Sequence, residues 1–506
     1  MGKIYSQTIN NFSRGITNDV RVSDTRYAQM IKSFDAHTYA HKLVPFRSSE
    51  SGDSAASTSQ KQAFAIALRS AGVYKLFGLG VISGTARAEV LMKSLSTGGS
   101  SDLGDNGWDT PSNNQSSAGS TSFNLFVYYA KTALIYGARA GTNIWAFDPT
   151  SAAVWADSHQ ALTYTKIAQG LVHSKDDILY IPYDNKIAKN NNGSWTVAAL
   201  TLPTHFYITS ICEYGNYLAI ACAPLSGFGK SVVYLWDRDA TLTTLSESID
   251  WGNGVLQILE EINGYLIGIS FVGSSSTALK AKLIFKRYSG GSPVIFQELE
   301  SETTFTTSDF PIFKQKENKA LYFLLSIKMG GVTHQGLWKV AQNPDGNFLV
   351  TMDRNPNNDT ALTSGTLQGF IIVGDYVFIS YVDSSVYVLS KTDNSANYNV
   401  SATYESLKLG NLRQNKKLRV AGVMTEAMPT AGQIILKYKK DEETSWTTIF
   451  TNTTDNNMYH EALNIESSGA ELPQFREIQF QILSTGNAVV TGLYYSWEDI
   501  NDNPSD

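Results

Sequence analysis

The sequence predicts an almost all-β protein: a β-propeller of about seven blades followed by a C-terminal antiparallel β-sandwich. Three observations support this fold class. The composition favours strands, because only 17% of the 506 residues are charged while the chain contains 26 Tyr and 23 Phe. A hairpin pattern recurs between residues 61 and 400, and a different strand pattern follows it. The predicted domains are therefore an N-terminal arm (1–60), the propeller (61–400) and the sandwich (401–506).

Residues 1–60 are expected to form an arm rather than a core. Their first part, around residues 10–16, is loop-like. A short helix is predicted next, with Ser23 as its N-cap. The apolar residues that indicate this helix recur at helical spacing, at Tyr27, Met30, Ile31 and Phe34. A polar stretch over 48–59 then leads into the propeller.

The propeller is predicted from seven strongly apolar strands, each preceded by a hairpin turn and followed by a second strand that ends in a polar turn. They recur at steps of roughly 40–60 residues, near the spacing of about 40–50 residues for four-stranded blades. The strands are anchored at Tyr74, Ala133, Ile178, Tyr217, Tyr265, Ala320 and Tyr376. Because continuous apolar runs suit strands that are buried on both faces, we expect these to be the inner strands of the blades. Unrelated hairpins in two stacked sandwiches would not require such regular spacing.

A long insert, residues 94–122, separates the first two apolar strands. It is rich in Ser, Gly and Asn. We expect it to be an exposed loop that is either flexible or used for interaction.

The strand pattern changes after about residue 400, where apolar and polar residues alternate with a period of two. The alternating segments are 417–423, 433–438, 446–450, 477–482 and 488–495. Short polar turns join them, which predicts a small antiparallel β-sandwich. Lysines at 437, 439 and 440 would discourage unwanted pairing at a sheet edge.

The charge of the chain excludes one broad class of function. A formal net charge of −6 argues against a general nucleic-acid binder, which would need a basic face to neutralise phosphates. It leaves open a conduit for DNA, because an acidic lumen would keep the strand from adhering. The sequence begins without an apolar stretch typical of a secretion signal, and no apolar run reaches the roughly 18 residues that a membrane span requires, so no membrane association is expected.

The two cysteines, Cys212 and Cys222, flank a predicted hairpin that turns at Gly215 and Asn216. This register places Cys212 opposite Ala219, which leaves Cys222 too far along its strand for a disulfide. We therefore predict free thiols in a reducing compartment.

The sequence contains no motif that predicts a metal or cofactor site. His37 and His41 are spaced to share a metal on a helix, but no HExxH frame supports such a site. Oxygen-bearing side chains alternate from Asp353 to Asp359, as in a calcium loop, but the Gly and Glu that an EF-hand requires are missing. We predict a surface loop there, and no cofactor.

Catalytic residues are not predicted either. The sequence has no GxSxG elbow, Walker loop or GxGxxG fingerprint, and its turn–Trp segments lack the spacing of sialidase boxes. The acidic pairs Asp176–Asp177 and Asp237–Asp239 fall at turns, where Asp suits the backbone. A glycosidase pair cannot be selected from sequence, because its two carboxyl groups need no fixed spacing along the chain.

The overall plan resembles virion proteins of tailed bacteriophages. The resemblance rests on residues 11–18 (NFSRGITN), residues 42–47 (KLVPFR), the propeller, and the terminal segment 475–482 (FREIQFQI). These features look like the β-propeller tail hub or nozzle proteins of short-tailed phages, which prolong the DNA exit channel and close behind the packaged genome. The resemblance covers most of the chain in architecture, but its motifs are short and transfer no functional residue.

The resemblance implies a structural protein of the virion tail, assembled in the host cytoplasm, rather than an enzyme. Its expected partners are identical copies in a ring, other tail proteins and, transiently, passing DNA. Two alternatives remain open. A receptor- or glycan-binding propeller is suggested by the aromatic residues and the 94–122 insert, and a glycan-cleaving enzyme would require two facing carboxylates.

Overall fold

The computed structural model describes residues 4–17, 24–51, 59–82, 87–96, 102–105, 107–111, 121–139, 141–150, 155–225, 229–239, 247–272, 281–303, 313–356, 365–383, 386–393, 398, 401–463 and 472–500. Every helix or strand assigned among these residues is a β-strand, so none of them belongs to a helix that could span a membrane. The chain divides into two compact units. The propeller unit comprises Glu50–Gln335 and Ala361–Thr392, and the sandwich unit comprises Met1–Ser49, Gly336–Thr360 and Asp393–Asp506.

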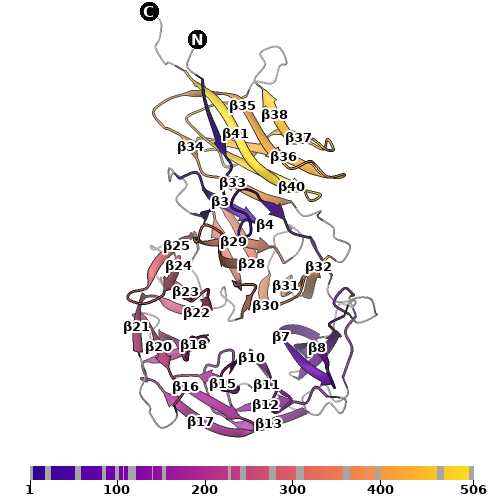
Figure 1. The fold of residues 1–506 in the computed structure, drawn as a ribbon, viewed down its shortest axis with the longest axis vertical. Coiled ribbons are helices and arrows are strands. Elements are labelled where there is room, and N and C mark those ends of the chain that lie inside the picture. The colour runs from indigo at the N-terminus through magenta and orange to yellow at the C-terminus, as the bar shows by residue number, and fades with distance from the viewer. Residues whose placement is uncertain are drawn as a thin grey trace, which may run out of the picture. The chain divides into compact units, whose positions relative to one another are not determined.

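The fold is a β-propeller with a β-sandwich, as predicted (Figure 1). Among the described residues, six separate sheets and one part of a larger sheet form the seven blades. The first three blades are β7 (Ser59–Ser70), β8 (Val73–Ile82) and β9 (Ala88–Ser94); β10 (Thr121–Tyr129), β11 (Leu134–Arg139), β12 (Asn143–Phe147) and β13 (Trp155–Ala161); and β14 (Leu171–His173), β15 (Ile178–Tyr183), β16 (Lys186–Asn191) and β17 (Ser194–Thr201). The next two are β18 (Phe206–Tyr214), β19 (Tyr217–Pro224), β20 (Lys230–Trp236) and β21 (Glu247–Asn253); and β22 (Val255–Ile262), β23 (Tyr265–Val272), β24 (Ala281–Tyr288) and β25 (Val294–Ser301).

The last two blades complete the ring. The sixth contains β26 (Lys314–Glu317), β27 (Ala320–Met329) and β28 (Val332–Gln342), which are the first strands of a larger sheet. The seventh consists of β30 (Thr366–Val373), β31 (Tyr376–Asp383), β32 (Val386–Thr392) and β6 (Ser49–Ser51). Because β6 precedes the first blade in sequence and pairs with β32, the final blade combines distant parts of the chain.

All seven predicted apolar segments form strands, but none of them is the innermost strand of its blade. They correspond to the second strand of each blade, such as β19, whereas β7, β10, β18, β22 and β30 lie nearest the centre of the ring in Figure 1. A second strand is hydrogen-bonded along both edges and covered on both faces by neighbouring blades, so it carries a continuous apolar run. The first strand also faces the middle of the ring, where several of its side chains are polar.

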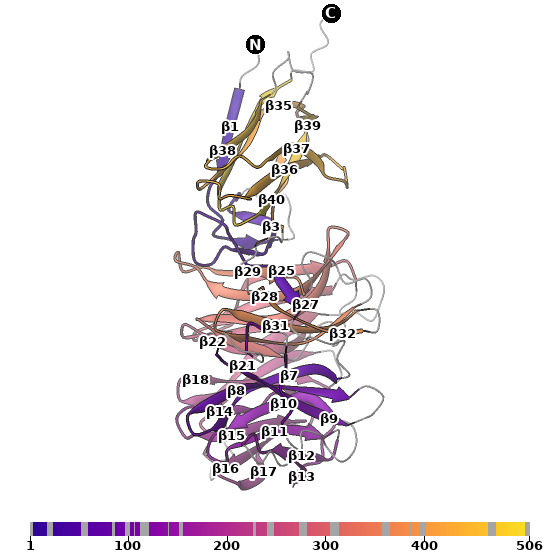
Figure 2. The ribbon, with the colours of Figure 1, turned by 90° about the vertical axis from the view of Figure 1, so that its right-hand side faces the viewer.

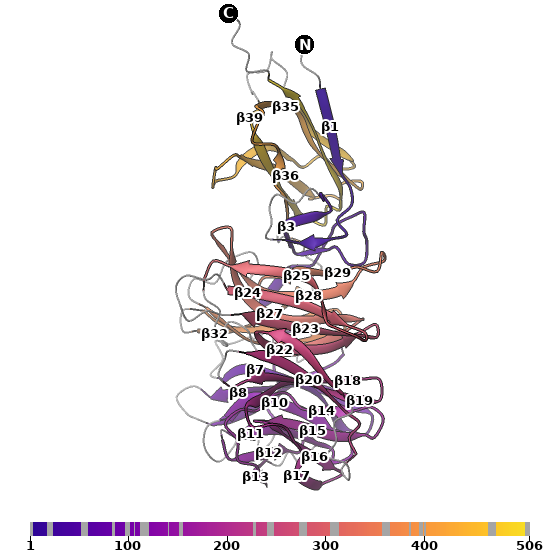
Figure 3. The same ribbon diagram turned by 90° about the vertical axis from the view of Figure 1, so that its left-hand side faces the viewer.

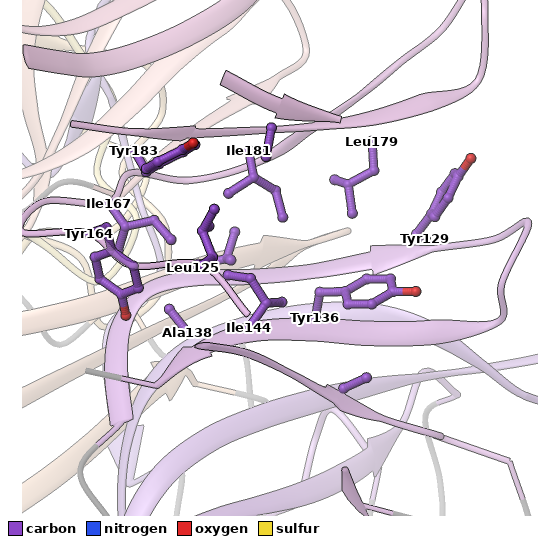
Figure 4. Close-up of a cluster of buried hydrophobic side chains, with 13 residues drawn as sticks. Leu125, Tyr129, Tyr136, Ala138, Ile144, Tyr164, Ile167, Leu179, Ile181 and Tyr183 are labelled. Atoms are coloured by element: carbon purple, nitrogen blue, oxygen red, sulfur yellow. The ribbon is translucent and has the colours of Figure 1, made fainter. Parts of the chain in front are cut away.

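Apolar side chains fill the borders between blades. Figure 4 shows one such cluster, in which Leu125, Tyr136 and Ile144 of the second blade lie against Leu179 and Ile181 of the third. All five are fully buried. Packing of this kind stabilises the border between neighbouring blades. Truncating one of these side chains would lose both its transfer free energy and its contacts across the border.

Two glycines in second strands make room for buried tryptophans. A Cβ atom on Gly137 would lie 2.0 Å from the ring of Trp145, its partner on the neighbouring strand. A Cβ atom on Gly268 would lie 2.3 Å from Trp251, which comes from the preceding blade. Neither position can accept a larger residue unless the indole moves.

The two larger sheets described in the sandwich unit pack through residues such as Phe480 and Tyr495, whose ring centroids are 5.3 Å apart. One sheet has the order β1 (Ile4–Ile9), β41 (Val490–Asp499), β35 (Lys416–Thr425) and β38 (Tyr459–Leu463), with β39 (Gln474–Phe475) also paired to β35. Figures 2 and 3 show β1 at the margin of this sheet.

The other sheet of this unit continues from β28 through β29 (Phe348–Arg354), β3 (Tyr27–Lys32), β33 (Ala402–Ser406), β40 (Glu477–Thr485), β36 (Gln433–Lys440) and β37 (Thr447–Asn452). Short strands extend it: β2 (Gly15–Ile16) pairs with β3, and β34 (Leu409–Gly410) pairs with β40. A separate two-stranded sheet joins β4 (Phe34–Asp35) to β5 (Val44–Pro45). The pairing is antiparallel except where β3 meets β2 and β29.

The predicted helix near the N-terminus is wrong. Residues 27–32 form strand β3, in which Ile31 is fully buried, and the predicted cap Ser23 lies outside the described residues. Strand pairing overrides the helical spacing, because β3 is hydrogen-bonded to β33 on one side and to β29 on the other. The expected arm also differs from the observed units: β1 and β3 belong to the sandwich unit, and the units do not divide at residues 60 and 400.

The described part of the 94–122 insert is not simply exposed. Leu103 is 5% exposed, and residue Asp109 forms a β-bridge with Met92 of the first blade. The rest of the insert, including residues 112–120, lies outside the described residues.

Candidate functional site

The strongest candidate site is a cavity of about 430 Å³ within the propeller unit. It is lined by residues in or just before the first strands of blades three to six, namely β14, β18, β22 and β26. Glutamates, lysines, glutamines and hydroxyl residues supply most of the lining. This polarity contrasts with the apolar second strands beside it, so the inner strands carry whatever chemistry the cavity offers.

Lys314 joins three blades through its ammonium group. Its Nζ lies 2.7 Å from Oε2 of Glu260, and it donates hydrogen bonds to the backbone oxygens of Ile211, at 2.9 Å, and Leu259. The side chains of Lys314 and Glu260 are 11% and 14% exposed. Because an ammonium group has three donors, these three acceptors satisfy it. Partial shielding from water strengthens the attraction within the pair.

Two glutamines link other blade borders in the same way. Gln169 donates from Nε2 to the oxygen of Phe126 at 3.0 Å and accepts from the nitrogen of Phe126 at 3.3 Å. Gln315 makes the same two contacts with Ile372, at 2.8 and 2.7 Å. Each amide therefore pairs with both backbone groups of one residue in the adjacent blade, as a neighbouring strand would.

Hydroxyl groups of β18 complete the set of links. Thr209 donates to the backbone oxygen of Leu256 at 2.5 Å. Ser210 donates to the oxygen of Leu259 and accepts from its nitrogen, both at 3.3 Å. The fourth and fifth blades are thus joined by side-chain hydrogen bonds at their inner strands.

Each of the three glutamates that line the cavity has a partner within the protein. Glu260 pairs with Lys314, and Glu261 pairs with Lys316. Glu213 accepts hydrogen bonds from the nitrogen and hydroxyl of Ser174, at 2.5 and 2.6 Å. A glycosidase needs one carboxyl group to protonate the leaving group and a second to act as nucleophile or base. All three pairings observed here join side chains of neighbouring blades.

Among the acids considered from sequence, Asp176 is hydrogen-bonded to two other side chains. Its Oδ2 atom accepts from Nε of Arg238 at 2.8 Å and from the hydroxyl of Tyr180 at 2.9 Å. Burial opposes ionisation of Asp176, but the hydrogen bonds from Arg238 and Tyr180 hold the pKa of this carboxyl below its usual range. Arg238 lies between Asp237 and Asp239, so turns of the third and fourth blades meet here. The turn interpretation also holds, because Asp176 accepts from the backbone nitrogen of Ile178.

The two histidines that could have shared a metal have separate environments. The Nε2 atom of His37 lies 3.3 Å from the oxygen of Leu349, and burial lowers the pKa of His37 to about 3. His41 instead approaches the oxygen of Asn10 through Nδ1, also at 3.3 Å. No group of three metal-ligating side chains occurs among the residues that the structure describes.

The predicted oxygen-rich loop is only partly described. Asp353 is a buried residue of β29 beside Arg354, whose Nε lies 2.9 Å from its Oδ2 atom. The surface-loop prediction is therefore wrong at Asp353, where pairing with β28 extends the strand. Residues 357–364 lie outside the described part of the chain, so the prediction is not tested there.

The predicted hairpin register around the two cysteines is confirmed. Cys212 pairs with Ala219 across the hairpin, Cys222 lies opposite Ile208, and both thiols are free. Burial raises the pKa of both thiols, so neither is activated as a nucleophile.

Sequence reasoning missed the residues that line the cavity, including Gln169, Glu260 and Lys314. No motif could reveal them, because they come from separate blades and meet only when the ring closes. The available signal was weak: β26 carries lysines at 314 and 316 directly before an apolar second strand.

No protein-family model matches the chain, and no curated protein matches its sequence. Among solved structures, it is similar to an exo-β-1,3-galactanase from Phanerochaete chrysosporium at 9% identity and a TM-score of 0.30, covering 88% of this chain and 100% of that one. It is also similar to the WD40 domain of a Toxoplasma gondii coronin at 9% identity and a TM-score of 0.38, covering 78% and 86% of the two chains.

Proposed function

We propose that this chain is a structural component of a bacteriophage tail, a nozzle- or hub-like subunit that forms a homo-oligomeric ring and docks other tail proteins. The proposed location is the virion, with assembly in the host cytoplasm and DNA passing in transient contact with the ring. The proposal rests on the sequence resemblance and on one structural observation, the open edges of the β1–β38 sheet in the sandwich unit.

Both edges of that sheet carry exposed apolar side chains. Among the described residues, β1 pairs with β41 alone and β38 pairs with β35 alone. Ile4 on β1 is 64% exposed, as is Tyr459 on β38, and Leu463 is 44% exposed. An open strand edge is a ready template for another chain, and clustered apolar exposure marks interaction surfaces. The sandwich unit is therefore suited to assembly.

The register shows why these side chains are exposed. On β38, His460 is buried, while Tyr459 and Leu463 point to the opposite face of the sheet. Leu463 pairs with Val420 and Tyr459 pairs with Met424, both half-buried residues of β35. Glu461 lies between Tyr459 and Leu463 on the same face and accepts from the hydroxyl of Tyr494, so the exposed face beside the open edge presents two apolar side chains flanking a carboxylate. Interfaces between proteins commonly combine apolar and polar groups in this way.

The cavity in the propeller unit favours a scaffold over a glycan-cleaving enzyme. Glu213, Glu260 and Glu261 are all held by protein donors, and Lys314 is satisfied by three acceptors. Such links make a propeller rigid, which a load-bearing ring needs.

Ring formation by the purified full-length chain tests the proposal. Light scattering should give a multiple of the monomer mass, and electron microscopy should show closed rings. A chain that stays monomeric at all concentrations, and that is missing from purified phage particles, would contradict the proposal.

Paired substitutions locate the interface. Tyr459→Glu combined with Leu463→Glu should reduce ring formation, because charges would be buried without partners. Val294→Glu is the matched control, since Val294 is 55% exposed on β25 and belongs to the propeller unit rather than to the sandwich sheet. Equal ring formation by the double variant and the control would place the interface elsewhere.

A further inference from the structure

We propose that residues 102–105 and 107–109 of the long insert act as a clasp, which holds the propeller ring closed between its seventh and first blades. The ammonium groups of Lys93 and Lys391 fasten this clasp. The proposal concerns the propeller unit and does not depend on the proposed function.

The border between the seventh and first blades differs from the others. At the other borders, blades that follow one another in sequence are neighbours. Here β30 of the seventh blade contacts β7 of the first, although about 300 residues separate them. β6 also reaches the outer side of the seventh blade to pair with β32. A border that joins distant segments needs contacts of its own, because chain continuity does not hold it together.

Lys93 organises the insert from inside the first blade. This lysine of β9 is fully buried. Its Nζ donates to the backbone oxygens of Asp102 at 3.1 Å, Asp105 at 2.8 Å and Gly107. The ammonium group also lies 5.2 Å from the ring centroid of Trp108. Three carbonyls therefore satisfy its three donors, and the insert curls around a buried charge.

Lys391 attaches the insert to the seventh blade. Its side chain, on β32, is 1% exposed. Its Nζ donates to the backbone oxygen of Gly104 at 2.9 Å and forms an ion pair with Glu50 of β6. One ammonium group thus joins the seventh blade, its closing strand and the insert. A buried charge held in this way is costly to leave unpaired, so the three parts stabilise one another.

Apolar contacts complete the clasp. The ring centroid of Trp108 lies 6.4 Å from that of Phe64 on the first blade and 6.3 Å from that of Phe378 on the seventh. Leu103 is buried in the same cluster as Phe378. A Cβ atom on Gly78 would lie 3.2 Å from the Trp108 ring, so the small residue gives the indole room. The insert therefore touches both blades at the border.

Hydrogen exchange of the full-length chain, followed by mass spectrometry, tests the clasp. Lys391→Met removes the ammonium group and leaves the carboxylate of Glu50 and the oxygen of Gly104 without this donor. Exchange in β6, β7, β31 and β32 should then accelerate by about 10-fold or more, because local opening becomes easier. The third, fourth and fifth blades should exchange as in the unaltered chain.

Lys282→Met is the matched control. Lys282, on β24, is 42% exposed and pairs with Glu300 on the surface of the fifth blade. Its removal should leave exchange at the border between the seventh and first blades unchanged. The clasp is overturned if Lys391→Met leaves exchange unchanged, or accelerates it equally in all blades.

Trp108→Leu provides a second test that keeps both lysines, and it decides the matter if Lys391→Met does not fold. It should accelerate exchange in β7 and β31 before other strands, because it removes the contacts with Phe64 and Phe378. Uniform acceleration, or no change, would show that the insert merely adds to overall stability or covers the surface.

Discussion

The two units differ in where their strands find partners. In the propeller unit, a blade such as β10-β11-β12-β13 forms from consecutive strands joined by short turns. In the sandwich unit, β1 pairs with β41 at the opposite end of the sequence, and β3 lies between β29 and β33. One chain thus combines sheets built from consecutive strands with sheets built from strands far apart in the sequence. The two kinds should respond differently to substitution.

The largest expected effect concerns the links between blades in the propeller unit. Lys314→Met would leave Glu260 partly buried without its cation, together with the backbone oxygens of Ile211 and Leu259. Breaking a buried pair in this way costs about 3–5 kcal/mol. Calorimetry of the full chain should show a much lower unfolding temperature for the propeller unit.

Lys316→Met is the control on the same strand. Its side chain is 41% exposed and pairs with Glu261, whose side chain is 23% exposed. An exposed pair contributes about 0–1 kcal/mol, so this variant should unfold close to the unaltered chain. Similar losses for both variants would mean that the buried position of Lys314 does not matter.

A second substitution tests the packing between blades. Gly268→Ala places a Cβ atom 2.3 Å from Trp251, so the indole must move. Overpacking of this kind costs about 1–3 kcal/mol, measurable by chemical denaturation. Combining it with Trp251→Leu should give a smaller loss than the sum of the two single variants, because the clash is gone. Strict additivity would contradict a clash between the added Cβ atom and the indole of Trp251.

The propeller could be predicted from sequence because its signals are local. Apolar strands such as β19 and β23 follow short turns, and the register of Cys212 opposite Ala219 follows from the hairpin alone. The alternating strands of the sandwich were predicted for the same reason. The position of each apolar strand within its blade could not be predicted. First and second strands follow similar turns and differ only in which strands and blades surround them.

The N-terminal strands could not be predicted, because their partners lie far away in sequence. Tyr27, Met30 and Ile31 have a spacing that suits a helix, and the strand β3 exists because β29 and β33 offer it hydrogen bonds. The cavity was missed for a related reason. Lys314 and Glu260 meet across two blades, and nothing in either local sequence indicates that they pair.

The sandwich unit should be the more sensitive to acid through His37, which packs near Asp35 and Lys339. Burial lowers the pKa of His37 to about 3 in the folded chain, from 6.5 as an ordinary value. Because the unfolded chain takes up this proton first, the contribution to stability is present above pH 6.5 and is lost as the pH falls towards 3. The slope should approach about 1.4 kcal/mol per pH unit.

His37→Leu isolates this effect, because other groups titrate alike in both proteins. The difference in unfolding free energy between the unaltered chain and the variant, measured from pH 7 to pH 4.5, should shift in favour of the variant as the pH falls. Parallel curves would show that His37 does not titrate in this range on unfolding.

The smallest expected effect concerns a link across the sandwich sheet. The hydroxyl of Tyr494 on β41 donates to Glu461 on β38 at 2.7 Å, and its ring lies over Gly422 of β35. Tyr494→Phe keeps the ring and removes the hydrogen bond, which should cost about 0.5–1.5 kcal/mol. Gly422→Ala should cost more, because its Cβ atom would lie 2.3 Å from the ring and displace it. If denaturation showed a larger loss of unfolding free energy for Tyr494→Phe than for Gly422→Ala, the hydrogen bond of the hydroxyl would stabilise these three strands more than the packing of the ring does. Polar links would then contribute most to stability in both units.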